Sequence, residues 1–201
     1  MTLFAAALAS YLLGSVPTAY LLLKWTKRID IRTVGSGNVG ATNALRIAGV
    51  GVGATVFVID ALKGAIPAVV FARWADPSAP PALLCGTAAV IGHVFPCFLR
   101  FQGGKGVATT IGALVGSDPL TAGAVLLVWA GTFAMSRFVS IASIAAAAAI
   151  PIAQGILHRP SLQLWLGGSL ALLIIARHRS NIQRLLASSE YRAWSRNKRS
   201  G

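Results

Sequence analysis

The sequence has few acidic residues, few charges of any kind and almost no cysteine. Only 5 of its 201 residues are Asp or Glu, and charged residues make up 11% of the chain, against about 25% in a soluble domain. Cys85 and Cys97 form no CxxC pair and no His/Cys cluster, which excludes a disulfide framework and a zinc site. A divalent metal site requires several carboxylates, so we expect no metal. We expect no other cofactor either.

What the sequence does contain is apolar: 55% of the residues are hydrophobic and the mean hydropathy is +0.70. Alternation at a period of two is absent, which argues against a membrane barrel. The composition predicts an all-α integral membrane protein with about seven transmembrane helices, forming a single domain over residues 1–201. The expected spans cover residues 3–23, 50–73, 81–97, 106–117, 119–136, 138–157 and 161–176. The fourth span is short, and a partly buried or re-entrant helix is the alternative there.

Basic residues orient these spans, because Lys and Arg accumulate in cytoplasmic loops. Of the 18 Lys and Arg residues, only Arg73 and Arg159 fall on one side and Lys63 falls within a span. The others share the opposite side: Lys24, Lys27, Arg28, Arg32, Arg46, Arg100, Lys105, Arg137, Arg177, Arg179, Arg184, Arg192, Arg196, Lys198 and Arg199. This asymmetry predicts a cytoplasmic tail over about 177–201 and, with seven spans, an N-terminus outside. We expect anionic substrates rather than nucleic acid, since a nucleic-acid binder would not bury most of its length in apolar runs.

The first predicted cytoplasmic loop contains GSGNVGATNALR, residues 35–46. Its glycines permit tight turns with open amides, and its short polar side chains and one arginine add hydrogen-bond donors for an oxyanion. The candidate ligands are Ser36, Asn38, Gly40, Thr42, Asn43 and Arg46. A flexible polar linker is the plainer alternative, but a linker has no need for such a density of donors.

The second predicted loop lies within FLRFQGGKGVATT, residues 98–110. It is not a nucleotide P-loop, because Leu99 stands where that motif needs glycine and Gly106 where it needs Ser or Thr. Glycine amides, a helix expected to start at about Val107 and the charge of Lys105 nevertheless predict an anion site. Its candidate residues are Gly103, Gly104, Lys105 and Gly106. A glycine-rich turn with a snorkelling lysine is the alternative.

Two further polar pairs lie at predicted cytoplasmic helix ends. Ser140 and Ser143 are three residues apart, as are His178 and Asn181, so each pair shares a helix face. The flanking arginines favour the neutral form of His178 by like-charge repulsion. Serines in apolar helices more often bond to their own backbone, and a histidine at a membrane boundary is more often structural.

The second span carries Asp60 and Lys63 one turn apart. We expect an internal ion pair that braces the side of the first loop, rather than direct chemistry.

Several known chemistries are excluded by missing motifs. The paired-aspartate motif of CDP-alcohol phosphotransferases is absent. The HxxxxD dyad of acyl-CoA and acyl-carrier acyltransferases is absent as well, since Phe98, Gln163 and Gln183 stand at the acidic position after the three histidines. A basic, glycine-lined pocket suits acyl transfer from a donor whose leaving group is itself an anion.

Three long motifs carry a resemblance to a known family: GSGNVGATNALR, HVFPCFLRFQGGKGVATT and HRSNIQRL followed by Glu190. Together with GSVP (14–17) and DALKG (60–64), they resemble the PlsY family of bacterial glycerol-3-phosphate acyltransferases over nearly the whole chain. One departure is Ser188, where the family usually has glycine two residues before the final Glu.

The resemblance implies a bacterial inner-membrane enzyme whose active site faces the cytoplasm. Such enzymes transfer an acyl chain from acyl phosphate to the 1-hydroxyl of glycerol 3-phosphate, giving lysophosphatidic acid, and need no acyl-CoA, acyl-carrier protein or metal. We expect Ser36, Lys105, His178 and Asn181 to be catalytic, with Ser143 and the remaining loop candidates binding substrate. The donor's phosphate would accept the hydroxyl proton, with His178 as general base the rival. A transporter or channel for an organic phosphate is the alternative function.

Overall fold

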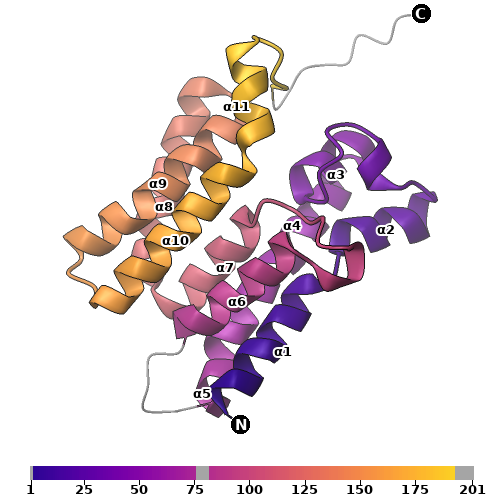
Figure 1. Ribbon diagram of the computed structural model, residues 1–201. Coiled ribbons are helices and arrows are strands. Elements are labelled where there is room, and N and C mark those ends of the chain that lie inside the picture. Colours follow the sequence, from indigo (N-terminus) through magenta and orange to yellow (C-terminus); the bar gives the residue numbers. More distant parts are fainter. Residues whose placement is uncertain (1, 76–81, 193–201) are drawn as a thin grey trace, which may run out of the picture. The chain divides into compact units, whose positions relative to one another are not determined.

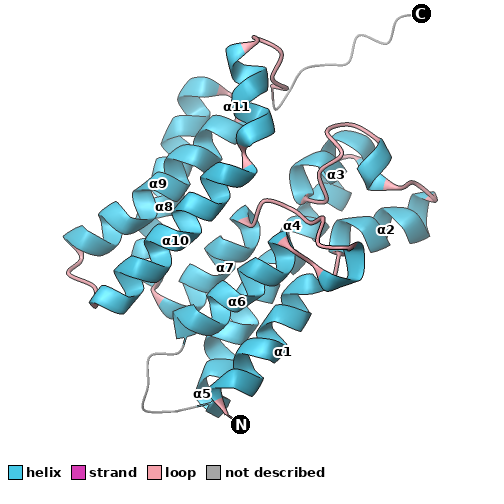
Figure 2. Ribbon diagram, viewed as in Figure 1, coloured by secondary structure: helices cyan, strands magenta, loops and turns pink. Residues whose placement is uncertain are grey.

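The computed structural model of the protein describes residues 2–75 and 82–192, and within these two segments it is helical, with no strand (Figure 2). The predicted all-α fold is therefore confirmed. Residue 81, the first of the expected third span, and residues 193–201 of the expected tail lie outside the described segments.

The chain divides into two compact units, Met1–Ala122 (unit 1) and Gly123–Gly201 (unit 2), coloured along the sequence in Figure 1. The boundary falls inside one helix, α8 (Pro119–Ser136). The single domain expected from the sequence stays a prediction.

Unit 1 opens with two helices in place of one continuous span. Helix α1 (Leu3–Ser15) ends before Pro17, and α2 (Thr18–Lys27) begins directly after it, because proline removes a backbone donor and clashes with the preceding turn. The remaining elements are η1 (Ile31–Thr33), α3 (Ala41–Ala48), α4 (Val50–Ile66), η2 (Pro67–Phe71), α5 (Ala72–Ala75), α6 (Ala82–Val94), η3 (Cys97–Leu99) and α7 (Val107–Ser117). Element η2 is a π-helical turn that starts at Pro67, and the amide of Ala72 bonds to the Pro67 carbonyl.

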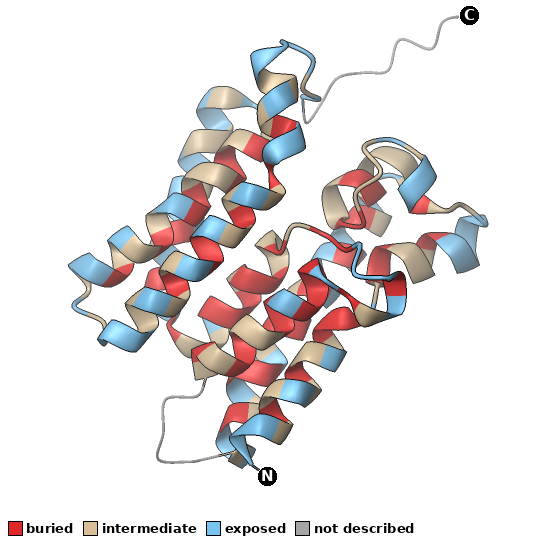
Figure 3. Cartoon of the chain, viewed as in Figure 1, coloured by how far each residue is buried: buried red, intermediate tan, exposed pale blue. Residues whose placement is uncertain are grey.

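Helix α7, the short fourth span of the sequence prediction, is packed closely against α4 and α6 (Figure 1). Glycines make this approach possible. A Cβ on Gly64 would collide with the Thr109 carbonyl, one on Gly112 with the Ala61 carbonyl, and one on Gly86 with Ala113. Small residues thus let helix backbones meet, as they do between membrane helices in general, and the middle of α7, from Thr109 to Leu114, is largely buried (Figure 3).

Unit 2 consists of most of α8, α9 (Val139–Ile156), α10 (Ser161–Arg177) and α11 (Arg179–Leu186). Helices α9 and α10 pack along each other (Figure 1), and Gly167 makes room for the buried side chain of Gln154. The described tail residues 187–192 follow α11 without further helix.

Five segments are long and apolar enough to cross a membrane: Leu3–Lys27, Val50–Ala75, Ala82–Leu99, Pro119–Ser136 and Val139–Ile156. They correspond to five of the expected spans, and the other two expected spans are the shorter apolar helices α7 and α10. The number of crossings and the orientation of the termini stay predictions.

Candidate active site

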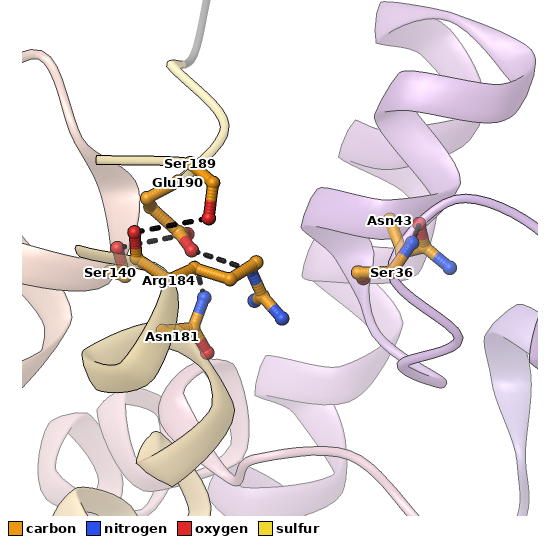
Figure 4. A network of polar contacts seen from close by, with 7 residues as sticks. All are labelled: Ser36, Asn43, Ser140, Asn181, Arg184, Ser189 and Glu190. Atoms are coloured by element: carbon orange, nitrogen blue, oxygen red, sulfur yellow. Dashed lines mark hydrogen bonds and ion pairs between the residues drawn. The ribbon is translucent and has the colours of Figure 1, made fainter. Parts of the chain in front are cut away.

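The first loop of unit 1 is shaped by two glycines and one asparagine. Gly35 and Gly37 adopt positive φ angles of 62° and 70°, which glycine tolerates far better than other residues. Asn43 is buried, and its Oδ1 accepts a hydrogen bond from the amide of Ser36 at 3.0 Å (Figure 4). Its Nδ2 lies within hydrogen-bond distance of three loop carbonyls, those of Ile31, Val34 and Asn38.

These contacts give Asn43 a structural function that the sequence did not indicate. Its amide group holds the loop around Ser36 and Asn38, which are themselves half-buried. Direct binding of substrate by Asn43, Ser36 or Asn38 stays a prediction. The tight approach of Asn43 also explains Gly35, since a Cβ there would strike the Asn43 amide oxygen.

The other candidates of the first motif lie on a helix that the sequence did not predict. Residues 24–49 were expected to form a loop, but α3 occupies Ala41–Ala48, with Gly40 at its N-cap. Thr42 lies in its first turn and Arg46 in its last turn. Helix α3 packs on α4, which gives an amphipathic segment a face to bury.

The second loop folds back onto the end of α6. After η3, Arg100 and Phe101 both have positive φ angles, 51° and 61°, and so reverse the chain. Gly103 then donates its amide to the Val94 carbonyl at 3.2 Å, and Gly104 donates to the His93 carbonyl at 3.1 Å. The sequence predicted that these two amides would be open to an anion, and that prediction is wrong, because α6 accepts both of them.

The open donors of this loop lie one step further along the chain. Gly106 is the N-cap of α7 with φ of 85°, and the first bond to its carbonyl comes from the amide of Thr110 at 2.8 Å. The amides of the first turn of α7 therefore have no partner within the helix, and they lie at the positive end of the helix dipole. Half-buried Lys105 stands directly before them.

The two loops of unit 1 meet. Val39 of the first loop and Gly103 and Gly104 of the second line the same small pocket, together with the break between α1 and α2. Two of the three motifs are thus brought together within one unit.

A buried polar cluster lies among the helices of unit 1. Asp60 and Lys63 form an ion pair of 2.8 Å with side chains only 3% and 4% exposed, so the predicted internal pair is confirmed. Thr18 donates to the same Asp60 oxygen at 2.9 Å, and the Lys63 ammonium also donates to the Val16 carbonyl. The pair therefore joins α4 to the break between α1 and α2.

His93 is a further member of this cluster, and it was not among the residues predicted from the sequence. Its Nδ1 lies 3.8 Å from the same Asp60 oxygen. Its place in the motif HVFPCFLRFQGGKG, ten residues before Gly103, was the available signal.

In unit 2 the polar centre is Glu190, whose side chain is 2% exposed (Figure 4). Its Oε1 accepts from Asn181 at 2.7 Å and from Ser140 at 3.1 Å, and its Oε2 accepts from Arg184 at 2.8 Å. Glu190 thus connects the start of α9 to α11 and fixes the amide of Asn181.

His178 lies at the junction of α10 and α11 and is almost completely buried. Its Nδ1 lies 2.8 Å from the Ile174 carbonyl. Because a carbonyl only accepts, Nδ1 carries a proton, and in the neutral ring the lone pair is then on Nε2. Ser143, one turn into α9, accepts a hydrogen bond from the indole of Trp129 at 3.3 Å.

Every carboxylate in the described segments is engaged by the protein. Asp30 binds Arg32, Asp60 binds Lys63 and Thr18, and Glu190 binds Arg184. Asp118 accepts from the amide and hydroxyl of Thr121 and so caps α8. The candidate site is therefore one of cations, amides and hydroxyls.

These features are those of an integral membrane protein built of apolar helices, with cations and hydrogen-bond donors in its polar loops. The family model for glycerol-3-phosphate acyltransferase matches residues 4–188, and the chain belongs to that family. Similar proteins include the glycerol-3-phosphate acyltransferases of Myxococcus xanthus, 43% identical over 94% of this chain and 98% of the relative, and of Geotalea daltonii, 44% identical over 91% and 93%.

Two solved structures are similar over 94% of both chains. Both are of PlsY (YgiH), described as an integral membrane glycerol 3-phosphate acyltransferase. The glycerol 3-phosphate form has a TM-score of 0.89 at 39% identity, and the lysophosphatidic acid form has 0.86 at 38%.

Proposed function

We propose that the protein transfers a fatty acyl group from acyl phosphate to the 1-hydroxyl of glycerol 3-phosphate. The products are lysophosphatidic acid and inorganic phosphate. The observation that carries the proposal is the similarity, over 94% of the chain, to one enzyme solved with glycerol 3-phosphate and with lysophosphatidic acid. These two ligands differ by a single acyl group, so they support glycerol 3-phosphate as the acceptor and lysophosphatidic acid as the product but leave the donor open.

The chemistry of the candidate residues supports acyl phosphate as the donor. An acyl phosphate presents a leaving group that is already anionic, and a cation beside helix amides stabilises developing negative charge on it. The carboxylates of the described segments are each bound to a protein partner, so they support neither a metal-binding role nor that of a general base. We propose that the reaction requires no metal, acyl-CoA or acyl-carrier protein.

Unit 1 supplies the phosphate contacts in this proposal. Lys105 and the first turn of α7 hold the donor's phosphate, with Gly106 permitting the close approach and Gly103 and Gly104 placing the loop against α6. The first motif serves the phosphate of glycerol 3-phosphate, through Ser36, Asn38, Gly40, Thr42, Asn43 and Arg46. Lys105 contributes charge to both.

The acceptor's hydroxyl oxygen attacks the carbonyl carbon of the donor, the new ester bond forms, and the bond from that carbon to the phosphate oxygen breaks. The hydroxyl proton goes to the departing phosphate. His178, Asn181 and Ser143 of unit 2 act in the same reaction by binding glycerol 3-phosphate, and His178 Nε2 is the rival proton acceptor. Orientation of two bound reactants supplies much of the rate, up to about 7–11 kcal/mol in well-oriented systems.

We place the protein in the bacterial inner membrane with this site facing the cytoplasm, on the strength of the distribution of basic residues. A C-terminal reporter that is active only in the cytoplasm tests that orientation. An inactive reporter on a folded, membrane-inserted protein would overturn it.

Purified protein, acyl phosphate and labelled glycerol 3-phosphate test the activity directly. We expect labelled lysophosphatidic acid in the presence of a metal chelator, and none when acyl-CoA replaces acyl phosphate. Uptake of glycerol 3-phosphate into sealed vesicles without any product would instead identify a transporter.

A further inference from the structure

Unit 1 holds a small pocket that is lined by residues 103–104 and is partly open to solvent. The break between α1 and α2 contributes Ser15 and Thr18 to its wall, and the end of α6 contributes His93. The Ser15 hydroxyl is buried and has no hydrogen-bond partner among the described residues. Polar side chains thus line part of the pocket wall, which ordinary packing between apolar helices does not require.

The imidazole of His93 occupies the space where a side chain of residue 104 would be. A Cβ on Gly104 would meet Nε2, Cε1 and Cδ2 of that ring as its three nearest atoms. A Cβ on Gly103 would instead meet the main-chain carbonyls of His93 and Val94 and the ring of Pro96. The His93 ring thus supports Gly104, whereas backbone and proline atoms support Gly103.

The ring is itself held from the opposite side. Asp60 lies 3.8 Å from its Nδ1, and Asp60 is fixed by Thr18 at 2.9 Å and by Lys63 at 2.8 Å. All of these side chains are buried. A chain of contacts therefore runs from the centre of α4 through His93 to Gly104, immediately before Lys105.

We propose that His93 is a positioning residue for the proposed acyl transfer, and that it acts through Gly104. It fixes the backbone from which Lys105 and the first turn of α7 follow, with Asp60 holding the ring in place. The inference rests on the proposed function, because it assigns the second loop to the phosphate of the donor.

A double-mutant cycle between His93 and Gly104 tests this contact. Gly104 does not have a positive φ, so the main obstacle to alanine there is the His93 ring. Gly104→Ala alone should raise the KM for acyl phosphate by about tenfold or more, and in a His93→Ala background the same change should cost less than about threefold. Gly103→Ala is the matched control, since removing the ring does not relieve its contacts, and its effect should be equal in both backgrounds.

His93→Ala alone should raise the KM for acyl phosphate by about tenfold, while kcat changes by less than about threefold. His93→Gln, which restores an amide near the position of Nε2, should show a smaller rise in this KM. A general loss of folding would lower the amount of active enzyme and hence kcat, so it would not give this split. If His93→Ala does not fold, His93→Asn provides the cycle, because its shorter side chain also vacates the space beside Gly104. His158→Asn controls for loss of a histidine outside unit 1 and should leave both constants unchanged.

Equal effects of Gly104→Ala in both backgrounds, with active wild-type enzyme, would overturn the positioning role and leave the proposed function standing. Absence of lysophosphatidic acid from the wild type would overturn the proposed function itself.

Discussion

Two ion-paired carboxylates with buried side chains, Asp60 of unit 1 and Glu190 of unit 2, are held in different ways. Asp60 of unit 1 binds Lys63 on its own helix, three residues away, and both side chains are almost completely buried. Glu190 of unit 2 binds Ser140 from 50 residues earlier in the chain and Arg184 from α11, whose side chain is 26% exposed. Asp60 lies within helix α4, whereas Glu190 follows the end of α11.

The difference shows two ways of fixing a polar site at a membrane. No substrate contact is predicted for Asp60. Thr18 and Lys63 fix its carboxylate, which supports the second loop through His93. Glu190 binds a predicted site residue directly, since it accepts a hydrogen bond from Asn181. Loss of Asp60 should therefore lower stability and act on the second loop through His93, whereas loss of Glu190 should lower stability and act directly on the unit 2 site.

The largest effect is expected when the unit 1 pair is broken. Asp60→Asn leaves the Lys63 ammonium buried without a counter-charge, which should lower the free energy of unfolding by about 3–5 kcal/mol. Glu190→Gln should cost about 1.5–3 kcal/mol, because Arg184 can reach water. Denaturant titration in detergent micelles compares the two variants, and the double variant Asp60→Asn with Lys63→Met should recover much of the loss. Equal costs for the two single variants would remove the distinction between the clusters.

The phosphate contacts of unit 1 can be tested with two cations of the same loop. Lys105→Met removes a charge and a donor beside the first turn of α7, and kcat should fall by about 10²–10³, or 2.7–4 kcal/mol. Arg100→Met is the control, because Arg100 is exposed at the edge of the loop, and its kcat should change by less than about threefold. Steady-state kinetics with acyl phosphate provides the measurement. Similar losses of kcat in both variants would indicate a general electrostatic attraction of anions by the loop instead of a phosphate site.

Unit 2 should behave as a binding region for glycerol 3-phosphate. His178→Gln keeps a hydrogen-bonding side chain, so the KM for glycerol 3-phosphate should rise by about tenfold while kcat is largely retained. If kcat of this variant collapses and its pH profile loses a limb, His178 is the general base and accepts the hydroxyl proton.

A smaller effect is expected at the turn that leads to Glu190. Ser188 is exposed and has a φ of 53°, the left-handed conformation that favours glycine at the end of a helix. Ser188→Gly should therefore raise the free energy of unfolding by about 0.5–1 kcal/mol and leave activity unchanged. The thermal-unfolding midpoint provides the measurement, and a lower midpoint would show that the serine has a function of its own in this turn.

The smallest effect concerns the exposed pair of the first loop. Hydrogen bonds from Arg32 lower the pKa of Asp30 from 3.8 to about 2. A lowered pKa means that the pair stabilises the folded state above about pH 4 and that this contribution is lost as the pH falls through about 2. Because the pair is partly solvated, Asp30→Asn should cost less than about 1 kcal/mol at pH 7 and clearly less than that at pH 2. An equal cost at both pH values would show that the charge of Asp30 does not matter.

The helical class and most helix positions could be predicted from the sequence because they follow from apolar run length. The break at Pro17 and the π-helical turn at Pro67 fall inside apolar runs and do not change hydropathy, so the run length alone could not reveal them. Helix α3 was not predicted, because it is short and its apolar face is buried only by packing against α4.

The candidate site was predictable at the level of residue type and less so at the level of contacts. Glycines and Lys105 do lie in the second loop, and their gathering at one substrate site stays a prediction. That the amides of Gly103 and Gly104 are taken up by α6, and that Asn43 binds its own loop, depends on a chain reversal at Arg100 and Phe101 that no local pattern indicates. The role of His93 likewise appears only when a loop and a helix end are seen in contact.

The account depends most on acyl phosphate as the donor, and the ratio of the two products tests this directly. Lysophosphatidic acid and inorganic phosphate should be measured together during turnover of purified enzyme with acyl phosphate, glycerol 3-phosphate and a metal chelator. We predict equal amounts of both products at every time point. Phosphate released without lysophosphatidic acid, or lysophosphatidic acid formed only with acyl-CoA or an added metal, would contradict the account.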